Sequence, residues 1–127
     1  MGDKRAWKWI FSKMDSFEVD QRGPHRVFKR FHRALTARYP CICSLSDEEV
    51  DNGVWADGPL INNFGWDFGV VALSFPAVSM ALPFVVRTAA RYGIFTFDEQ
   101  INLISRPRLM QRIRAFLRGF RRRGRPR

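Results

Sequence analysis

The charged residues of this chain are divided unevenly along its length. Residues 1–105 hold all twelve acidic residues and twelve of the 22 Lys and Arg residues, so this stretch is formally neutral. Residues 106–127 hold the other ten basic residues, and all ten are Arg. The net charge of +10 therefore belongs to the C-terminal extension and not to the body of the protein. We predict one folded domain over residues 1–105, followed by an Arg-rich extension over residues 106–127.

The body is long and apolar enough to bury a core. A chain of 127 residues suits a single domain, and 46% hydrophobic residues give it enough apolar surface to offset the ordering entropy of folding. Only two cysteines are present, which excludes a disulfide-dense scaffold and a zinc site with four cysteine ligands. The composition also excludes a disordered chain over most of this length.

Opposite charges gather on two segments of the body. Residues 22–38 contain only basic charged residues, whereas residues 47–57 contain only acidic ones. Ser46, with Glu49 three residues later, is expected to cap one short turn in the acidic segment. Complementary patches of this kind favour oriented docking to a charged partner. Two alternatives stay open: both segments face solvent, or they pair with each other.

Two helices are predicted from apolar spacing. Pro24 opens the first helix, whose apolar residues recur every three or four positions and share one face, and Pro40 ends it. Pro76 opens the second helix, and Gly93 suits the position just after its last turn. Pro83 lies within the second helix, so we expect it to bend that helix or to delay its start.

Strands are predicted from apolar runs and from alternation. Residues 70–75 are almost wholly apolar, which is typical of a central strand buried on both faces. Residues 94–97 and 101–104 predict a hairpin, residues 53–66 predict a weak strand and a structured loop, and residues 7–12 fit a strand and a helix about equally well. This order predicts an α+β fold: an antiparallel sheet with two main helices on one face (the ferredoxin-like or split βαβ plan), plus a basic C-terminal helix.

Insertion into a membrane is not expected. Residues 68–86 carry no charge and approach the length of a membrane helix, but Pro76 and Pro83 would interrupt that helix twice. We therefore predict no transmembrane span and a cytoplasmic location. In that compartment Cys41 and Cys43 would be reduced thiols.

No catalytic, metal or cofactor site is predicted. His25 and His32 are seven residues apart, about 10 Å along a helix, which is too far for one ion without other ligands. Cys41 and Cys43 do not have the spacing of a zinc pair, and no phosphate-binding glycine loop occurs. We expect a protein that is not an enzyme and needs no cofactor. An enzyme that uses Asp57, Cys41 or His32 stays an alternative.

Trp55 and the acidic segment form the candidate partner-binding set. Trp55 lies two residues from Asp57, and an exposed Trp is disproportionately a binding anchor. Trp66 is expected to fill the core, although Trp55 could do so as well. The candidate set consists of Asp47, Glu48, Glu49, Asp51, Trp55 and Asp57.

Three motifs in the body resemble segments of a group of small, mostly uncharacterised bacterial α+β proteins. They are Trp55-x-Asp57-Gly58-Pro59-Leu60, the LPFV sequence that begins at Leu82, and Phe97-Asp98 followed by Arg106-Pro107. The resemblance covers residues 24–107. Proteins of this kind resemble immunity proteins, which bind and neutralise bacterial toxins. By this fold-level analogy, the resemblance implies a non-enzymatic protein-binding module of the immunity type.

The C-terminal extension predicts a basic amphipathic helix. Its apolar residues recur with helical spacing, and arginines occupy the remaining faces. Such a helix can dock on the body, lie on an anionic membrane surface, or bind phosphates through bidentate guanidinium groups. Phosphate binding would make the chain a nucleic-acid-binding accessory protein, the alternative to a protein-binding module. The candidate polyanion-binding residues are Arg112, Arg114, Arg118, Arg121, Arg122, Arg123, Arg125 and Arg127.

Binding of nucleic acid through the extension predicts a steep dependence on salt. Each phosphate contact releases counterions, so the logarithm of the affinity for an oligonucleotide should fall linearly with the logarithm of the salt concentration. Truncation after Pro107 should abolish this binding. Fluorescence anisotropy of a labelled oligonucleotide measures the slope for the full-length and the truncated protein. Binding that survives the truncation would reject the extension as the site.

Overall fold

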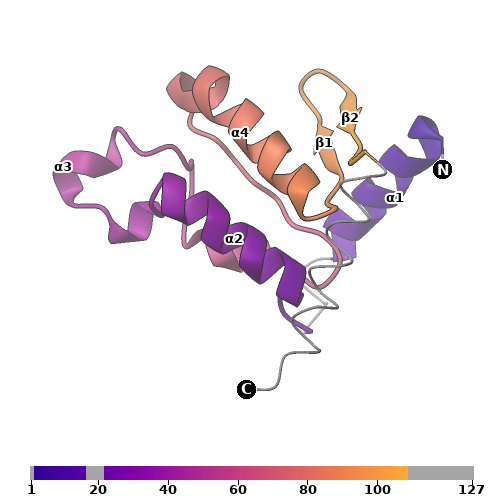
Figure 1. Cartoon of the computed structure of the whole chain (residues 1–127), viewed down its shortest axis with the longest axis horizontal. Helices are drawn as coiled ribbons and strands as arrows, with labels where there is room; N and C mark the ends of the chain where they lie inside the picture. The colour runs from indigo at the N-terminus through magenta and orange to yellow at the C-terminus, as the bar shows by residue number, and fades with distance from the viewer. Residues whose placement is uncertain (1, 17–21, 109–127) are drawn as a thin grey trace. The chain divides into compact units, whose positions relative to one another are not determined.

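A computed structural model of the chain describes residues 2–16 and 22–108 (Figure 1). The chain divides into two compact units, Met1–Leu82 and Pro83–Arg127. Residues 109–127 lie outside the described residues. The predicted basic helix and the polyanion-binding arginines fall there and stay predictions, as does the predicted domain boundary at residue 105.

The first unit begins with helix α1, Asp3–Ser16 (Figure 1). Residues 7–12, whose sequence fits a strand and a helix about equally well, are part of this helix. Ala6 and Ile10, one turn apart, are its buried residues, whereas Trp9 and Phe11 are 38% and 43% exposed. The alternating aromatic residues therefore do not share a buried face, and the spacing of a helix decides which side chains enter the core.

Helix α2, Arg26–Arg38, confirms the first predicted helix. His25 caps its N-terminus, because the His25 Nδ1 atom accepts a hydrogen bond of 3.0 Å from the Val27 N–H. Phe31 and Leu35 are the buried residues of the helix and lie one turn apart. The apolar stripe read from the sequence is thus the face that packs into the first unit.

An aromatic cluster joins α2 to the 3₁₀ turn η3, Leu60–Asn63. Phe64, which directly follows η3, stacks on Phe28 with ring centroids 5.7 Å apart and meets Phe31 edge-on at 5.9 Å. Gly69 faces Phe64 in an isolated bridge, and a side chain at Gly69 would collide with the Phe64 ring. The Phe64 ring therefore holds the loop after η3 against α2, and the His25 N–H adds a hydrogen bond of 3.2 Å to the Gly65 carbonyl.

Residues 70–75 do not form the predicted central strand. Val70 and Phe75 are 42% and 92% exposed, and the segment makes a single isolated bridge, between Leu73 and Trp55. A central strand needs a hydrogen-bonded neighbouring strand along each of its two edges. The segment around Trp55 is bounded by glycines and proline, which end the pairing after one bridge. The segment keeps backbone hydrogen bonds to residues 54, 56 and 63, but these do not extend into a regular strand.

Helix α4, Val78–Arg91, confirms the second predicted helix and follows the 3₁₀ turn η4, Phe75–Ala77. It starts before Pro83 and continues through it, so the expected delay of its start does not occur. The division between the two units falls at this proline. No helix in the described part of the chain has the length and apolarity needed to cross a bilayer.

The end of α4 confirms the predicted role of Gly93. Its φ of 72° lies in the left-handed region, which costs glycine nothing because it has no Cβ atom. The Gly93 N–H donates to the Ala90 carbonyl at 3.1 Å, and the Ile94 N–H donates to the Ala89 carbonyl at 2.9 Å. These two bonds form a Schellman motif. Because the Ile94 N–H is bonded to the helix, the following strand begins later than predicted.

The second unit contains the predicted hairpin, shifted by about two residues from the expected ranges. Strand β1, Thr96–Asp98, pairs antiparallel with strand β2, Leu103–Ser105. The Asp98 carboxylate accepts the Gln100 N–H at 3.1 Å, and Asn102 has a φ of 52°, so both favour the turn. Within the described ranges this is the only regular sheet. The structure is a mostly helical α+β arrangement, and the ferredoxin-like sheet is not formed there.

Trp55, and not Trp66, fills the core. Trp55 is 2% exposed, and its Nε1–H donates to the Tyr39 carbonyl at 2.7 Å. Trp66 is 41% exposed, meets His25 edge-on and lies beneath the Arg22 guanidinium. A buried indole needs an acceptor for its N–H, and the end of α2 supplies one only to Trp55. The core assignment of Trp66 was therefore wrong, and Trp55 does not offer an exposed anchor.

Replacement of Trp55 by Phe should destabilise the fold. The variant keeps an aromatic ring but removes the donor to the Tyr39 carbonyl, and we expect a loss of about 1–3 kcal/mol in the free energy of unfolding. Urea unfolding followed by circular dichroism measures this loss. Trp66→Phe is the matched control, with an expected loss below about 0.5 kcal/mol because Trp66 is half exposed. Equal losses in the two variants would contradict the assignment.

Candidate functional site

The acidic segment forms a short helix, α3, Asp47–Val50, beyond the C-terminal end of α2 (Figure 1). The Ser46 hydroxyl donates to the Glu49 carboxylate at 2.7 Å, and the Ser46 N–H approaches the same oxygen at 3.5 Å. The predicted cap is thus confirmed. Three acids lie in the first turn, where the positive end of the helix dipole favours negative charge.

The carboxylates at α3 are exposed to solvent. Within residues 2–16 and 22–108, the acids at positions 47, 48, 49 and 51 form no ion pair with a basic side chain. Asp57 is exposed as well, and its carboxylate accepts a hydrogen bond of 2.8 Å from the Asn63 amide. Five of the six candidate residues therefore lie on the surface, and Trp55 is the exception.

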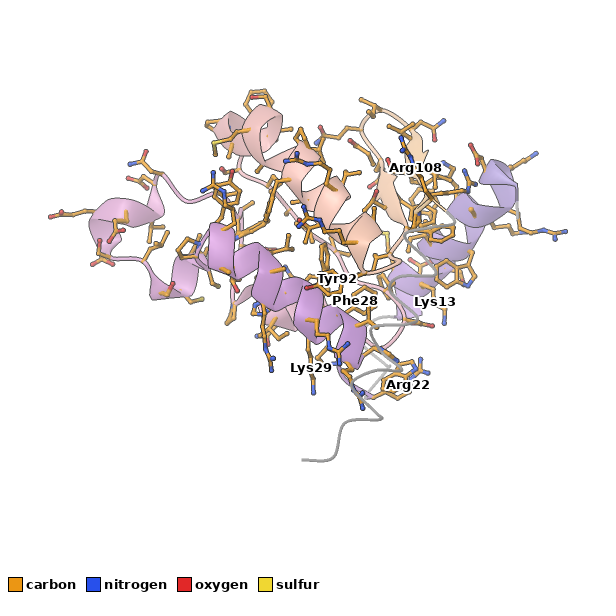
Figure 2. The ribbon with its side chains drawn as sticks, in the orientation of Figure 1. Lys13, Arg22, Phe28, Lys29, Tyr92 and Arg108 are labelled. Atoms are coloured by element: carbon orange, nitrogen blue, oxygen red, sulfur yellow. The ribbon has the colours of Figure 1, made fainter. Side chains whose placement is uncertain are left out.

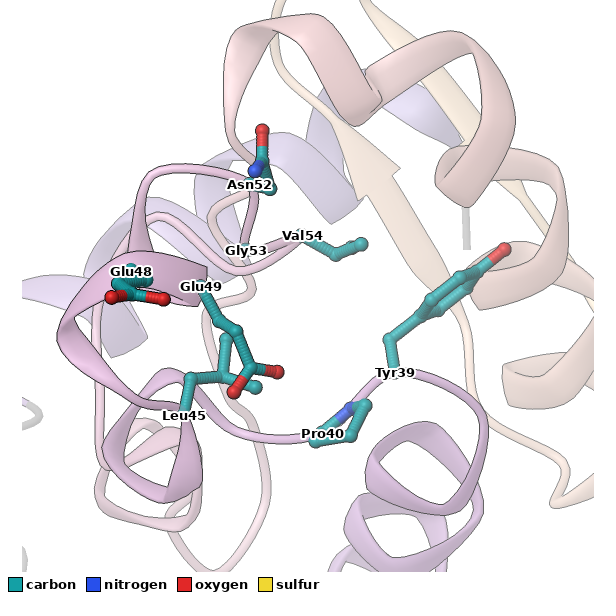
Figure 3. Close-up of a pocket in the computed structure, with 8 residues that line it drawn as sticks. All are labelled: Tyr39, Pro40, Leu45, Glu48, Glu49, Asn52, Gly53 and Val54. Carbon is teal, nitrogen blue, oxygen red and sulfur yellow. The ribbon is translucent and has the colours of Figure 1, made fainter.

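A pocket of about 280 Å³ opens beside α3 (Figure 3). One wall comes from the end of α2, and the other from α3 and the segment that follows it. In Figure 3 the Glu49 carboxylate points towards Pro40. The lining residues are Tyr39, Pro40, Leu45, Glu48, Glu49, Asn52, Gly53 and Val54. Carboxylates thus stand beside an apolar and aromatic surface, which is the environment that a long basic side chain requires.

Trp55 holds the Tyr39 wall of this pocket in place. The Trp55 Nε1–H bond reaches the Tyr39 carbonyl, and the two rings meet edge-on with centroids 6.3 Å apart. The Arg38 guanidinium lies 4.8 Å from the centroid of the Tyr39 ring. Sequence analysis placed the end of a helix at Pro40 but did not predict a pocket there. It missed the pocket because the residue that orients this wall lies 16 positions later in the chain.

Gly53 allows the opposite wall to approach closely. The Ser74 hydroxyl donates to the Gly53 carbonyl at 2.8 Å, and the Ser74 N–H donates to the Val54 carbonyl at 2.8 Å. An ideal Cβ atom at Gly53 would lie 2.8 Å from Ile42 Cγ2 and 3.1 Å from the Val50 carbonyl oxygen. Only glycine fits this position without movement of its neighbours.

The predicted basic segment lies on α2. Figure 2 shows Lys29 on the side of the helix opposite Phe28, which belongs to the aromatic cluster. Partial burial, and then the charge of Arg33, lower the pKa of His32 below its usual value. The positive charge of this face therefore comes from Arg and Lys, and the α3 acids do not pair with it in the described residues.

Lys13 on α1 and Arg22, which precedes α2, have an acidic partner outside α3. Lys13 lies 2.6 Å from the Asp67 carboxylate, and Arg22 lies 3.9 Å from it. These contacts tie α1 and the start of α2 to the loop after Trp66. The basic segment, residues 22–38, and the acidic segment, residues 47–57, therefore do not pair with each other in the described residues.

No protein-family profile, curated protein or solved structure matches this chain. The resemblance to immunity proteins therefore stays a prediction. In the ranges that the structure describes, no group of three or more His, Cys, Asp or Glu residues is arranged to hold a metal ion.

Replacement of Gly53 by Ala should destabilise the pocket. The added methyl group would meet Ile42 and the Val50 carbonyl, and overpacking of this kind costs about 1–3 kcal/mol in the free energy of unfolding. Thermal unfolding of the two proteins measures the loss. Gly2→Ala is the matched control, because a Cβ atom at Gly2 would meet nothing within 4 Å. A Gly53→Ala protein as stable as the control would contradict the close approach.

Proposed function

We propose that this chain is a non-enzymatic protein-binding module whose pocket beside α3 receives a basic side chain of a partner protein. One observation carries the proposal: exposed carboxylates, without an ion pair among the described residues, stand at the edge of a pocket with an apolar wall. Exposed acids alone would be a solvated face. Their position around a hollow lined by Tyr39, Pro40 and Val54 is what favours recognition.

The chemistry of the pocket suits an arginine or lysine side chain. The aliphatic part of such a side chain can pack on Pro40 and Val54, and its charged end can reach Glu48 or Glu49 at the rim. One Glu49 oxygen already accepts the Ser46 hydroxyl, but a carboxylate has about four acceptor positions in total. The volume of about 280 Å³ falls below the range of about 300–1,000 Å³ that is typical of small-molecule sites. One inserted side chain therefore fits better than a whole ligand.

A basic protein is the partner class that this surface supports. Charges that complement each other across an interface raise the rate of association and exclude wrong partners more than they add affinity. The resemblance to immunity proteins adds a narrower proposal, in which the partner is a bacterial toxin and this chain neutralises it by binding. A toxin that presents an Arg or Lys to the pocket would agree with the broader and with the narrower proposal.

Charge reversal at Glu48 tests the proposal. Co-expression with the product of the adjacent gene, followed by co-purification, should give a complex. Glu48→Lys should weaken this complex by about tenfold or more in calorimetry, because like charges in an interface cost several kcal/mol. Asp15→Lys is the matched control, because Asp15 is exposed on α1 and its replacement changes the net charge by the same amount. No complex at micromolar concentration, or equal weakening by both variants, would count against the proposal.

A small probe tests the pocket without a partner. We expect N-acetyl-arginine amide, at roughly millimolar concentration, to shift the backbone amide resonances of Leu45, Gly53 and Val54 in nuclear magnetic resonance spectra. Glu48→Lys should reduce these shifts, and Asp15→Lys should leave them unchanged. Shifts that are spread evenly over the chain would show that the probe binds by charge alone.

Nucleic-acid binding through the extension is the second candidate function. It is supported by the ten arginines that follow residue 105. The acidic pocket would repel a polyanion, so this activity would belong to the extension alone. The two functions are therefore separable, and the truncation after Pro107 removes one while it leaves the other intact.

A further inference from the structure

The fold brings Cys41 and Cys43 together at one point of the first unit. Cys41 is the N-cap of the 3₁₀ turn η2, Ile42–Ser44, and both cysteines are free thiols. An ideal Cβ atom at Gly58 would lie 3.1 Å from the Cys43 Sγ atom and 3.3 Å from the Cys41 Sγ atom. Both sulfur atoms therefore border the same small volume, which only a glycine at position 58 leaves open.

Backbone amides surround the Cys41 sulfur. The Leu60 N–H donates to Cys41 Sγ at 3.4 Å, and the Cys43 amide lies close enough to influence the same sulfur. Partial burial raises the pKa of the Cys41 thiol, but the bonds from Leu60, from the Cys43 amide and from the Cys43 thiol together outweigh this effect, so its pKa is lowered. The charge of Asp57 acts in the opposite direction and is the smallest of these influences. The fold thus favours a thiolate at Cys41.

The two thiols are not equivalent. Desolvation, followed by the hydrogen bond to Cys41 and by its charge, raises the pKa of Cys43. Cys43 is exposed, whereas Cys41 is half-buried. Of the two thiols, Cys41 is therefore the one that loses its proton more readily, and Cys43 is the more accessible neighbour. This division of roles is what thiol–disulfide exchange requires of two cysteines.

We propose that Cys41 and Cys43 form a thiol–disulfide exchange site, at which a low-molecular-weight disulfide oxidises the two thiols to an intramolecular disulfide. The inference stands on the placement of the two sulfur atoms around Gly58 and does not depend on the proposed partner. Cysteines two positions apart have Cα atoms at most about 7 Å apart, close to the range of about 4.4–6.8 Å that a disulfide spans. The bond can therefore form with only local movement of η2.

The exchange takes place in two steps. The Cys41 thiolate attacks one sulfur of the small disulfide, the S–S bond of that disulfide breaks, and one small thiolate leaves and takes up a proton from water. Cys43 then loses its proton and attacks the Cys41 sulfur of the mixed disulfide, which releases the second small thiol. In total, two protein thiols are oxidised, one disulfide is reduced to two thiols, and the reverse reaction with excess thiol restores the protein.

Glutathione disulfide is the probe for this site, and intact-protein mass spectrometry is the measurement. The full-length chain has only these two cysteines, so every product can be assigned. We expect the wild-type protein to lose the mass of two hydrogen atoms and to remain monomeric. Cys43→Ser should stop at the first step and gain one glutathione on Cys41. Cys41→Ser should react severalfold more slowly than Cys43→Ser, because the remaining thiol lacks the amide donors.

The unfolded chain and a glycine variant show whether the fold creates this reactivity. The same reaction in concentrated urea should be severalfold slower at neutral pH than in the folded protein. Gly58→Ala, whose methyl group would press on both sulfur atoms, should slow closure of the disulfide more than it slows alkylation of Cys41 by iodoacetamide. Three outcomes would overturn the proposal: a stable mixed disulfide in the wild type, dimers linked through Cys43, or equal rates in the folded and unfolded protein.

Discussion

The hydrogen bond between the Trp55 indole and the Tyr39 carbonyl is the contact on which the first unit depends most. Its donor, Trp55, is buried, and the bond links the C-cap residue of α2 to a segment 16 residues later. A carbonyl at the end of a helix has no partner within that helix, so a donor from elsewhere stabilises the end and fixes the direction in which the chain leaves it. The position of Tyr39 as a pocket wall follows from this contact, and Pro40 begins the segment that carries both the thiols and α3.

Ile42 connects the two chemical features of this unit. An ideal Cβ atom at Gly53 or at Gly58 would lie within 3 Å of its side chain, so the floor of the pocket and the thiol pair pack on the same residue. The acids of α3 begin a few positions later, where Ser46 and Glu49 organise the turn locally. The two thiols and the acidic pocket thus share one half-buried support, although the chemistry proposed for each is independent of the other.

Local signals predicted several elements correctly. The apolar stripe of α2, the Ser46–Glu49 cap, the Gly93 end of α4 and the antiparallel pairing of the hairpin were all readable from neighbouring residues. Each depends on contacts within a few positions, which the order of the residues already determines. Residues 70–75 and Trp66 were misread because an apolar side chain shows only that burial is favourable, not that a partner is in reach.

The sequence by itself determined where charge lies and where the two main helices predicted in the body, α2 and α4, occur. It placed five acids in one short segment and two cysteines one residue apart. Only the tertiary structure decided that Trp55 is buried while Trp66 is exposed, that Tyr39 faces α3 across a pocket, and that Gly58 borders both sulfur atoms. Periodicity and capping act over one helical turn, whereas these placements depend on which distant segment meets a buried polar atom or fills a particular gap.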